Sequence, residues 1–134
     1  MELDSNAHSV FLLHYELILV VKYRREVLEA TVSNRAKEIF EKIAPNYNIT
    51  LQEWKAEKYY IHIFFKAHPK SEISKFINAY KSASSRLLKK EFPQIREKLW
   101  KETFWSQSFC LLTTGTAPAE VIEEYLESQG EKKR

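Results

Sequence analysis

Between Val10 and Val21 the side chains alternate between two sets. The first set is Phe11, Leu13, Tyr15, Leu17 and Leu19, and the second is His14, Glu16, Ile18 and Val20. A period of two is that of a β-strand, because successive side chains point to opposite faces of a sheet. The segment is therefore predicted to be a strand. It is too short and too polar to span a membrane, which takes about 20 apolar residues.

Three later segments have apolar positions at helical spacing, three or four residues apart. The predicted helices are Glu26 to Ala44, Ser71 to the residue before Pro93, and Pro118 to about Gln129. Proline suits the first turn of a helix and glycine suits its end, so Pro118 and Gly130 fit the bounds of the last helix. The Ser71 hydroxyl is a candidate cap for the second helix.

Three more segments are rich in β-forming residues: Ile49 to Trp54, Tyr60 to Ala67, and Thr103 to Thr114 before Gly115. The first two are separated by a short charged connector, Lys55 to Lys58, which suits a hairpin. The order strand, helix, strand, strand, helix, strand, helix predicts an α+β fold, a ferredoxin-like (RRM-like) split βαβ antiparallel sheet with an added C-terminal helix. We expect one domain over residues 1–134, with flexible tails at 1–8 and 131–134. Such a sheet hosts many functions, so the fold alone identifies none of them.

Composition and charge narrow the possible functions. The net charge of the 134 residues is only +3, but the middle of the chain is locally basic and could contact phosphate. A solvated helix face is the commoner meaning of such a charge run, and both interpretations stay open. Only two glycines are present, which argues against a glycine-rich phosphate loop. The single cysteine, Cys110, cannot form an internal disulfide and is expected to be buried and inert.

The acidic amino terminus does not resemble a secretory signal, so a cytoplasmic protein is expected.

Two sets of side chains are candidates for chemistry. Tyr125 and Gln129 are four residues apart on the last predicted helix, so they share one face. The Tyr125 phenol is a possible nucleophile, although the spacing alone favours a packing role beside Val121 and Ile122, since amphipathic stripes are usually core. In the third strand, His62 is a possible metal ligand, but a lone histidine is more often hydrogen-bonded structure.

Five segments taken together resemble one family. They are Lys22 to Leu28 (KYRREVL), Tyr60 to Phe64 (YIHIF), Tyr80 to Arg86 (YKSASSR), Phe104 to Phe109 (FWSQSF) and Tyr125 to Gln129 (YLESQ). In this order they are similar to the single-tyrosine HUH transposases, the TnpA proteins of the IS-two-hundred / IS-six-hundred-five insertion sequences. The resemblance extends from about Ser9 to Gln129.

The resemblance implies a fold, an assembly and an activity. Proteins of this family are homodimers that merge two ferredoxin-like sheets and exchange their last helices, so that each site takes its tyrosine from the partner chain. They bind DNA hairpins and cut single-stranded DNA through a 5′-phosphotyrosine intermediate, with a divalent metal. The resemblance places Tyr125 at the nucleophile position and Gln129 at a metal-assisting position.

The metal motif departs from the family at four positions. The family has Asp-His-hydrophobic-His in the third strand, but here Tyr59 and Tyr60 occupy the first two positions and only His62 remains. Lys55 stands where an acidic residue is usual, and Glu16 stands where a histidine is usual. A neutral phenol is a poor ligand for Mg²⁺ or Mn²⁺, so the metal site is predicted to be degraded. The metal is expected as a cofactor only if cleavage survives.

Three hypotheses follow. The first is a protein that binds hairpin-forming single-stranded DNA with lost or weakened cleavage. The second is an active transposase with Tyr125 as nucleophile and an unusual metal shell of His62, Gln129 and Glu16 or Glu57. The third is a protein-interaction module that retains only the dimer scaffold.

Under either DNA-binding hypothesis, phosphate contacts are expected from basic residues beside the first strand and on the second helix, with base stacking by one tryptophan. The predicted residues are Lys22, Arg24, Arg25, Lys75, Lys81, Arg86, Lys89, Lys90 and Trp105. The expected partners are hairpin-bearing single-stranded DNA and a second copy of the chain, in the cytoplasm of a prokaryotic cell and at the nucleoid when DNA is bound. No membrane partner is expected.

Overall fold

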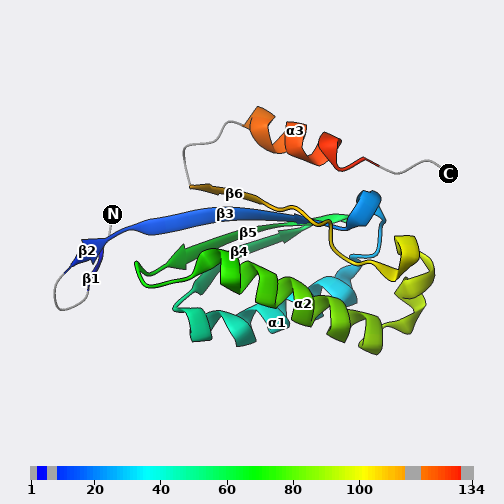
Figure 1. Cartoon of the computed structure of the whole chain (residues 1–134), viewed down its shortest axis with the longest axis horizontal. Helices are drawn as coiled ribbons and strands as arrows, with labels where there is room; N and C mark the ends of the chain where they lie inside the picture. Colours follow the sequence, from blue (N-terminus) through cyan, green and yellow to red (C-terminus); the bar gives the residue numbers. More distant parts are fainter. Residues whose placement is uncertain (1–2, 6–8, 114–118, 131–134) are drawn as a thin grey trace.

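An antiparallel four-stranded sheet organises the computed structural model, which describes residues 3–5, 9–113 and 119–130. The main elements are β3 (Leu13–Val20), α1 (Ala30–Ile43), β4 (Thr50–Ala56), β5 (Tyr60–Ala67), α2 (Ile73–Glu91), β6 (Cys110–Thr113) and α3 (Ala119–Ser128). The strand order is β4-β5-β3-β6. The predicted α+β ferredoxin-like fold is therefore confirmed. Figure 1 shows α1 and α2 on one face of the sheet and α3 on the other.

The core forms where the predicted apolar sets meet. Leu17 and Leu19 are fully buried on the face of β3 that α1 and α2 cover. Phe40 of α1 packs edge-on against Phe76 of α2, with ring centroids 5.0 Å apart. The fully buried Tyr80 donates a hydrogen bond of 2.9 Å from its hydroxyl to the Ala36 carbonyl. Apolar burial therefore joins both helices to the sheet, and one buried hydrogen bond joins the two helices.

Several elements differ from the prediction in their bounds or caps. Helix α1 begins four residues later than predicted, because Leu28 is buried in irregular backbone and donates its N–H to the Lys58 carbonyl at 3.0 Å. Strand β4 continues to Ala56, so Lys55 lies in a strand and not in a connector. Ser71 does not cap α2, because its hydroxyl accepts from the His68 N–H and donates to the Asn48 carbonyl.

The last predicted strand, Thr103 to Thr114, is shorter than expected. The chain first forms two 3-10 turns, η3 (Pro93–Glu97) and η4 (Trp100–Glu102), and β6 begins only at Cys110. Between η4 and β6, one isolated β-bridge joins Trp105 to Val21, the residue after β3. The predicted positions Thr114, Gly115 and Pro118 lie outside the described residues.

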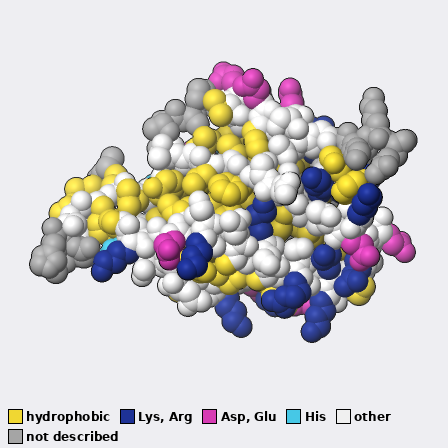
Figure 2. Space-filling view, in the orientation of Figure 1, with side chains coloured by type: hydrophobic (Ala, Val, Ile, Leu, Met, Phe, Trp, Pro, Cys, Tyr) yellow, Lys and Arg dark blue, Asp and Glu magenta, His cyan; other side chains and the backbone are white. Residues whose placement is uncertain are grey.

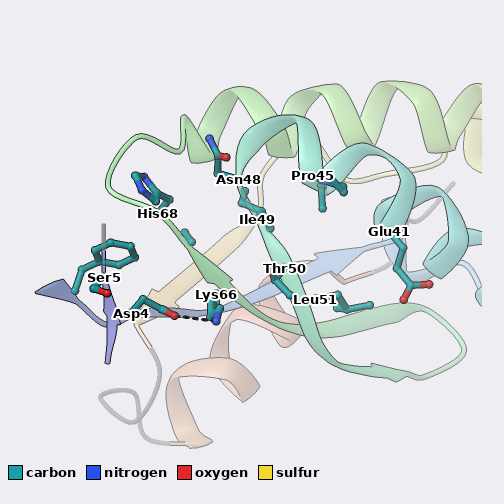
Figure 3. Close-up of a pocket in the computed structure, with 13 residues that line it drawn as sticks. Asp4, Ser5, Glu41, Pro45, Asn48, Ile49, Thr50, Leu51, Lys66 and His68 are labelled. Carbon is teal, nitrogen blue, oxygen red and sulfur yellow. Dashed lines mark hydrogen bonds and ion pairs between the residues drawn. The ribbon is translucent and has the colours of Figure 1, made fainter. Parts of the chain in front are cut away.

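An N-terminal hairpin was not predicted. Strand β1 (Asp4–Ser5) pairs with β2 (Val10–Phe11), so Asp4 and Ser5, which belong to the predicted tail, form a short strand. Residues 1–2 and 6–8 of that tail lie outside the described residues. Lys66 and Asp4 form an ion pair of 3.0 Å, which joins the hairpin to β5. Figure 3 shows the pocket of about 560 Å³ that results between this hairpin, the end of α1 and the start of β4. The predicted tail at residues 131–134 lies outside the described residues.

The surface has basic and apolar regions. Figure 2 shows Lys and Arg side chains over α2 and over the end of the molecule where η3 and η4 lie. An apolar area extends along the sheet edge beneath α3. None of the described helices is both long enough and apolar enough to cross a membrane.

Candidate functional site

The candidate site lies on the face of the sheet opposite α1 and α2. In the strand register, Ile18 pairs with His62 and Glu16 pairs with Phe64. Lys55 of β4 also pairs with His62, and Cys110 of β6 pairs with Ile18. Because paired residues point to the same face, these side chains and Tyr60 lie together on the α3 side of the sheet. The fold thus collects most of the positions that the resemblance had assigned to a metal.

Glu16 and His62 are in direct contact at the centre of this face. The distance between His62 Nε2 and Glu16 Oε1 is 2.9 Å. The two side chains are only 18% and 11% exposed, so solvent screens this interaction weakly. The His62 ring also stacks on Phe64, with centroids 4.4 Å apart. The imidazole is therefore held by a carboxylate on one side and a ring on the other.

The described side chains on this face are not arranged as metal ligands. His62 and Glu16 direct their ligating atoms at each other, and no group of three His, Cys, Asp or Glu side chains able to hold a metal occurs among the described residues. Lys55 lies above the Phe64 ring at 5.2 Å and pairs with Glu53 at 3.3 Å, so it brings positive charge to this face. Burial raises the pKa of Tyr60, with smaller contributions from Glu57 and Tyr59, so this phenol stays neutral.

Tyr125 and Gln129 are each hydrogen-bonded to a serine in the segment before β6. The Tyr125 and Ser108 hydroxyls are 2.9 Å apart, and Ser106 donates to Gln129 Oε1 at 2.5 Å. Burial raises the pKa of Tyr125, and the hydrogen bond to Ser108 lowers it in part. Arg24 donates to the Leu126 carbonyl at 3.3 Å and so also contacts α3. The sequence analysis quoted both serines in a family motif but gave them no role, because nothing in the sequence shows that this segment contacts the last helix.

Two predicted DNA contacts have structural roles here. Trp105 is 6% exposed and donates its indole N–H to Ser84 at 2.9 Å, so its ring is not placed to stack on a base. Lys81 is half-buried and donates to the Gln107 carbonyl at 3.0 Å. Desolvation lowers the pKa of Lys81. Both side chains connect α2 to the segment before β6.

The remaining predicted DNA contacts form two groups. Lys22, Arg24 and Arg25 lie at η1 (Lys22–Arg24) and just after it, and the two arginines line a pocket of about 500 Å³. Arg24 lies over the Tyr59 ring at 5.2 Å. The second group is on α2. Its exposed members are Lys75, Arg86 and Lys90. Its fourth member, Lys89, is half-buried and donates to the Glu102 carbonyl at 3.0 Å.

Cys110 is not fully buried as predicted. It is partly exposed because β6 is an edge strand of the sheet. Burial raises the pKa of the thiol, and the nearby Glu16 charge adds to the increase. A thiol with a raised pKa is a weak nucleophile, so the expectation of low reactivity still agrees with this environment.

Comparison with known proteins gives consistent similarities. Residues 9–129 match the family described as "Transposase IS200 like". The chain is 33% identical over 132 residues to the ISDra2 transposase TnpA of Deinococcus radiodurans, which covers 98% of this chain and 94% of that protein. It is 26% identical over 128 residues to the transposase for insertion sequence element IS200 of Salmonella typhimurium, with coverages of 96% and 84%.

Solved structures agree with these relatives. A crystal structure described as that of a transposase from Deinococcus radiodurans matches with a TM-score of 0.87 and 30% identity, over 96% of this chain and 99% of the other. A REP-associated tyrosine transposase bound to a REP hairpin has the same fold, with a TM-score of 0.60 at 10% identity, over 93% of this chain and 67% of the other.

Proposed function

Because the chain belongs to the IS200-like transposase family, we propose that it binds hairpin-forming single-stranded DNA and that its metal-dependent cleavage is lost or strongly weakened. The contact between Glu16 and His62 is the observation that carries the proposal. It engages the one histidine that remains of the family's metal motif. The hairpin bound to the REP-associated relative supports DNA of this kind as the partner.

The nucleophile position needs a cation to activate it. We assign Tyr125 to that position, with Gln129 four residues later, directly after the end of α3. An ordinary phenol has a pKa of about 10, and burial raises that of Tyr125, so the group is neutral at pH 7. A nearby cation would have to stabilise both the phenolate and the charge that builds on phosphate. Without a bound metal, attack on DNA is therefore expected to be very slow.

The first test combines DNA binding with covalent trapping. The protein is incubated with hairpin-bearing single-stranded DNA and Mn²⁺, and both the complex and the Tyr125 adduct are measured. We expect a complex and little or no adduct. The restored variant Y59D/Y60H/K55E is expected to recover Mn²⁺ binding, measured by calorimetry, before it recovers cutting, because Glu16 also departs from the family pattern.

The Tyr125→Phe variant is the control, because it removes the nucleophile and leaves the sheet face unchanged. An adduct on the unmodified protein, formed as fast as on the restored variant, would refute the loss of cleavage. That result would favour the second candidate, an active transposase. The second candidate has one observation in its favour: Glu16 places a carboxylate beside His62, so a metal that displaced their mutual contact would meet two ligands.

A second test concerns the basic residues. We expect R86A/K90A to weaken hairpin binding about tenfold and to lower the salt dependence of the affinity, by about 0.7 in log–log slope per lost phosphate contact. The matched control is K37A/K42A, which removes two exposed positive charges from α1. Arg24 is unsuitable for this test because it also contacts Leu126 and Tyr59.

Equal loss in R86A/K90A and in the control would mean that only overall charge matters. An absence of hairpin binding by the unmodified protein would favour the third hypothesis, a protein-interaction module.

A further inference from the structure

Helix α3 has little apolar anchoring to the rest of the protein. None of its described side chains is fully buried, and Val121 is 39% exposed. A helix held by few apolar contacts depends on polar contacts for its exact position. Among the described residues, three hydrogen bonds join α3 to the body of the protein. Two of them end on Tyr125 and Gln129, and the third ends on the Leu126 carbonyl.

The two side-chain contacts match in spacing. Ser106 and Ser108 are two residues apart, and two residues of chain span at most about 7 Å. Tyr125 and Gln129 are four residues apart on a helix, which rises about 6 Å over that distance. The two serines can therefore contact both helix side chains at once, Ser106 with Gln129 and Ser108 with Tyr125. We call these two contacts the serine ladder.

The segment that carries the serines is held from two sides. The Ser106 N–H donates to the Val20 carbonyl at 2.8 Å, which joins it to the end of β3. On the other side, Lys81 donates to the carbonyls of Gln107 and Ser108, at 3.0 and 3.5 Å. Trp105, next to Ser106, is bonded to Ser84 of α2. A support with this many bonds to the core strand and to α2 is rigid enough to define a position.

We propose that Ser106 and Ser108 are positioning residues that dock α3 on the sheet and place Tyr125 and Gln129 as one unit. The inference rests on the proposed roles of these two residues. The serines hold each side chain by its polar end, so a shift of α3 that moves one moves the other. Lys81 and Trp105 act through this support and not through direct contact with DNA.

The test follows the docking of α3 by amide hydrogen exchange, without DNA or metal. In S106A/S108A the amides of residues 119–130 are expected to exchange at least about tenfold faster, because both contacts are lost. S106T/S108T keeps the hydroxyls and is expected to restore protection. The matched control T31A/S74A removes two exposed hydroxyls from α1 and α2, on the opposite face of the sheet, and should leave α3 unchanged.

A double-mutant cycle guards against a general loss of folding, since Ser106 is buried. S106A and Q129A remove the same contact from its two ends. The double variant S106A/Q129A should therefore exchange no faster in α3 than either single variant. Additive effects of the two substitutions, or exchange of α3 in S106A/S108A within about twofold of the unmodified protein, would overturn the proposal.

A second measurement, the pKa of Tyr125, distinguishes positioning of the phenol by Ser108 from a general attachment of α3 to the sheet. In S108A the Ser106 contact remains, so the Tyr125 phenol stays buried and loses the hydrogen bond that lowers its pKa. Its pKa, measured by NMR and assigned with Tyr125→Phe, is expected to rise. An unchanged or lower pKa in S108A would contradict positioning of the hydroxyl by Ser108. Neither amide exchange in α3 nor the pKa of Tyr125 requires DNA. The two measurements therefore test the role of the serines even if the protein proves not to bind hairpin DNA.

Discussion

Tyr23 and Arg24 show how single residues shape the candidate site. Both have left-handed backbone, with φ of 54° and 57°, although neither is glycine. Such a conformation costs roughly 1–2 kcal/mol per residue. The Tyr23 ring packs edge-on against Trp100 at 5.0 Å, and Arg24 lies over Tyr59. These contacts offset the strain and leave the Arg24 guanidinium beside α3, where it bonds Leu126.

Tyr80 gives a prediction at the same scale. Its hydroxyl is fully buried and donates to Ala36, and burial raises its pKa well above the ordinary range. Tyr80→Phe leaves the Ala36 carbonyl without this donor, so we expect a loss of about 1–2 kcal/mol in the free energy of unfolding, measured by urea denaturation. Tyr15→Phe, at a partly exposed ring stacked on Phe65, is the control and should change little. Equal effects of the two substitutions would contradict the role of the hydrogen bond.

At the scale of elements, an ion pair joins the two helices that cover the sheet. Arg35 of α1 and Glu91 of α2 are bonded at 2.7 Å, and both are partly exposed. The hydrogen bond from Arg35 lowers the pKa of Glu91 in the folded protein. A carboxyl with a lowered pKa contributes stability above its unfolded pKa, and this stability is lost as the pH falls through the folded pKa. Solvent screening limits the contribution to less than about 1 kcal/mol.

The pH dependence of this pair is testable. Glu91→Gln should lower the free energy of unfolding at pH 7, and the difference from the unmodified protein should disappear as the pH falls below the pKa of the folded carboxyl. Added salt should also reduce the difference. Glu97→Gln, an exposed glutamate on η3, serves as the control. A difference that persists at low pH would show that Glu91 acts by packing and not by charge.

At the scale of the whole molecule, β6 is an edge strand that hydrogen-bonds to β3 on one side in the described chain. Beside it lie the apolar area of Figure 2 and the weakly anchored α3. An unpaired apolar edge favours pairing with another chain. The described α3 contacts its own chain, and the exchange of helices between two chains remains a prediction.

We therefore expect the protein to be a dimer that pairs through β6. Light scattering should give the mass of two chains. Leu112→Lys, which puts a charge on the β6 edge, should yield monomers, whereas Thr50→Lys on the opposite edge strand β4 should leave the dimer intact. A stable monomer at micromolar concentration, observed by sedimentation, would be inconsistent with this assembly.

The sequence by itself determined the fold class and the family. Period-two alternation predicted the buried face of β3, and helical spacing predicted α1, α2 and α3, because both patterns are local consequences of backbone geometry. Five short motifs in order predicted the transposase family, which the comparisons confirm. The bounds that failed at Ala30 and Cys110 are places where contacts with distant segments override local preference. At Lys55 the pairing of the hairpin with β5 simply continues further than predicted.

The two faces of strand β5 show why the fold could be predicted even though the site departs from the family pattern. Ile61, Ile63 and Phe65 are fully buried toward the helices, while Tyr60 and His62 lie on the other face. Substitutions on the second face change the chemistry without disturbing the core. The departures at Tyr59 and Tyr60 therefore left the fold prediction unaffected.

Only the tertiary structure decided which side chains meet. His62 and Glu16 are 46 residues apart in the chain, and the two serine contacts to α3 span 23 and 17 residues. The same structure buried Trp105 against Ser84 and turned Lys81 toward backbone carbonyls, where the sequence had suggested DNA contacts. Residue type and local period carry no information on such pairs, because strand register and helix docking alone set their distances.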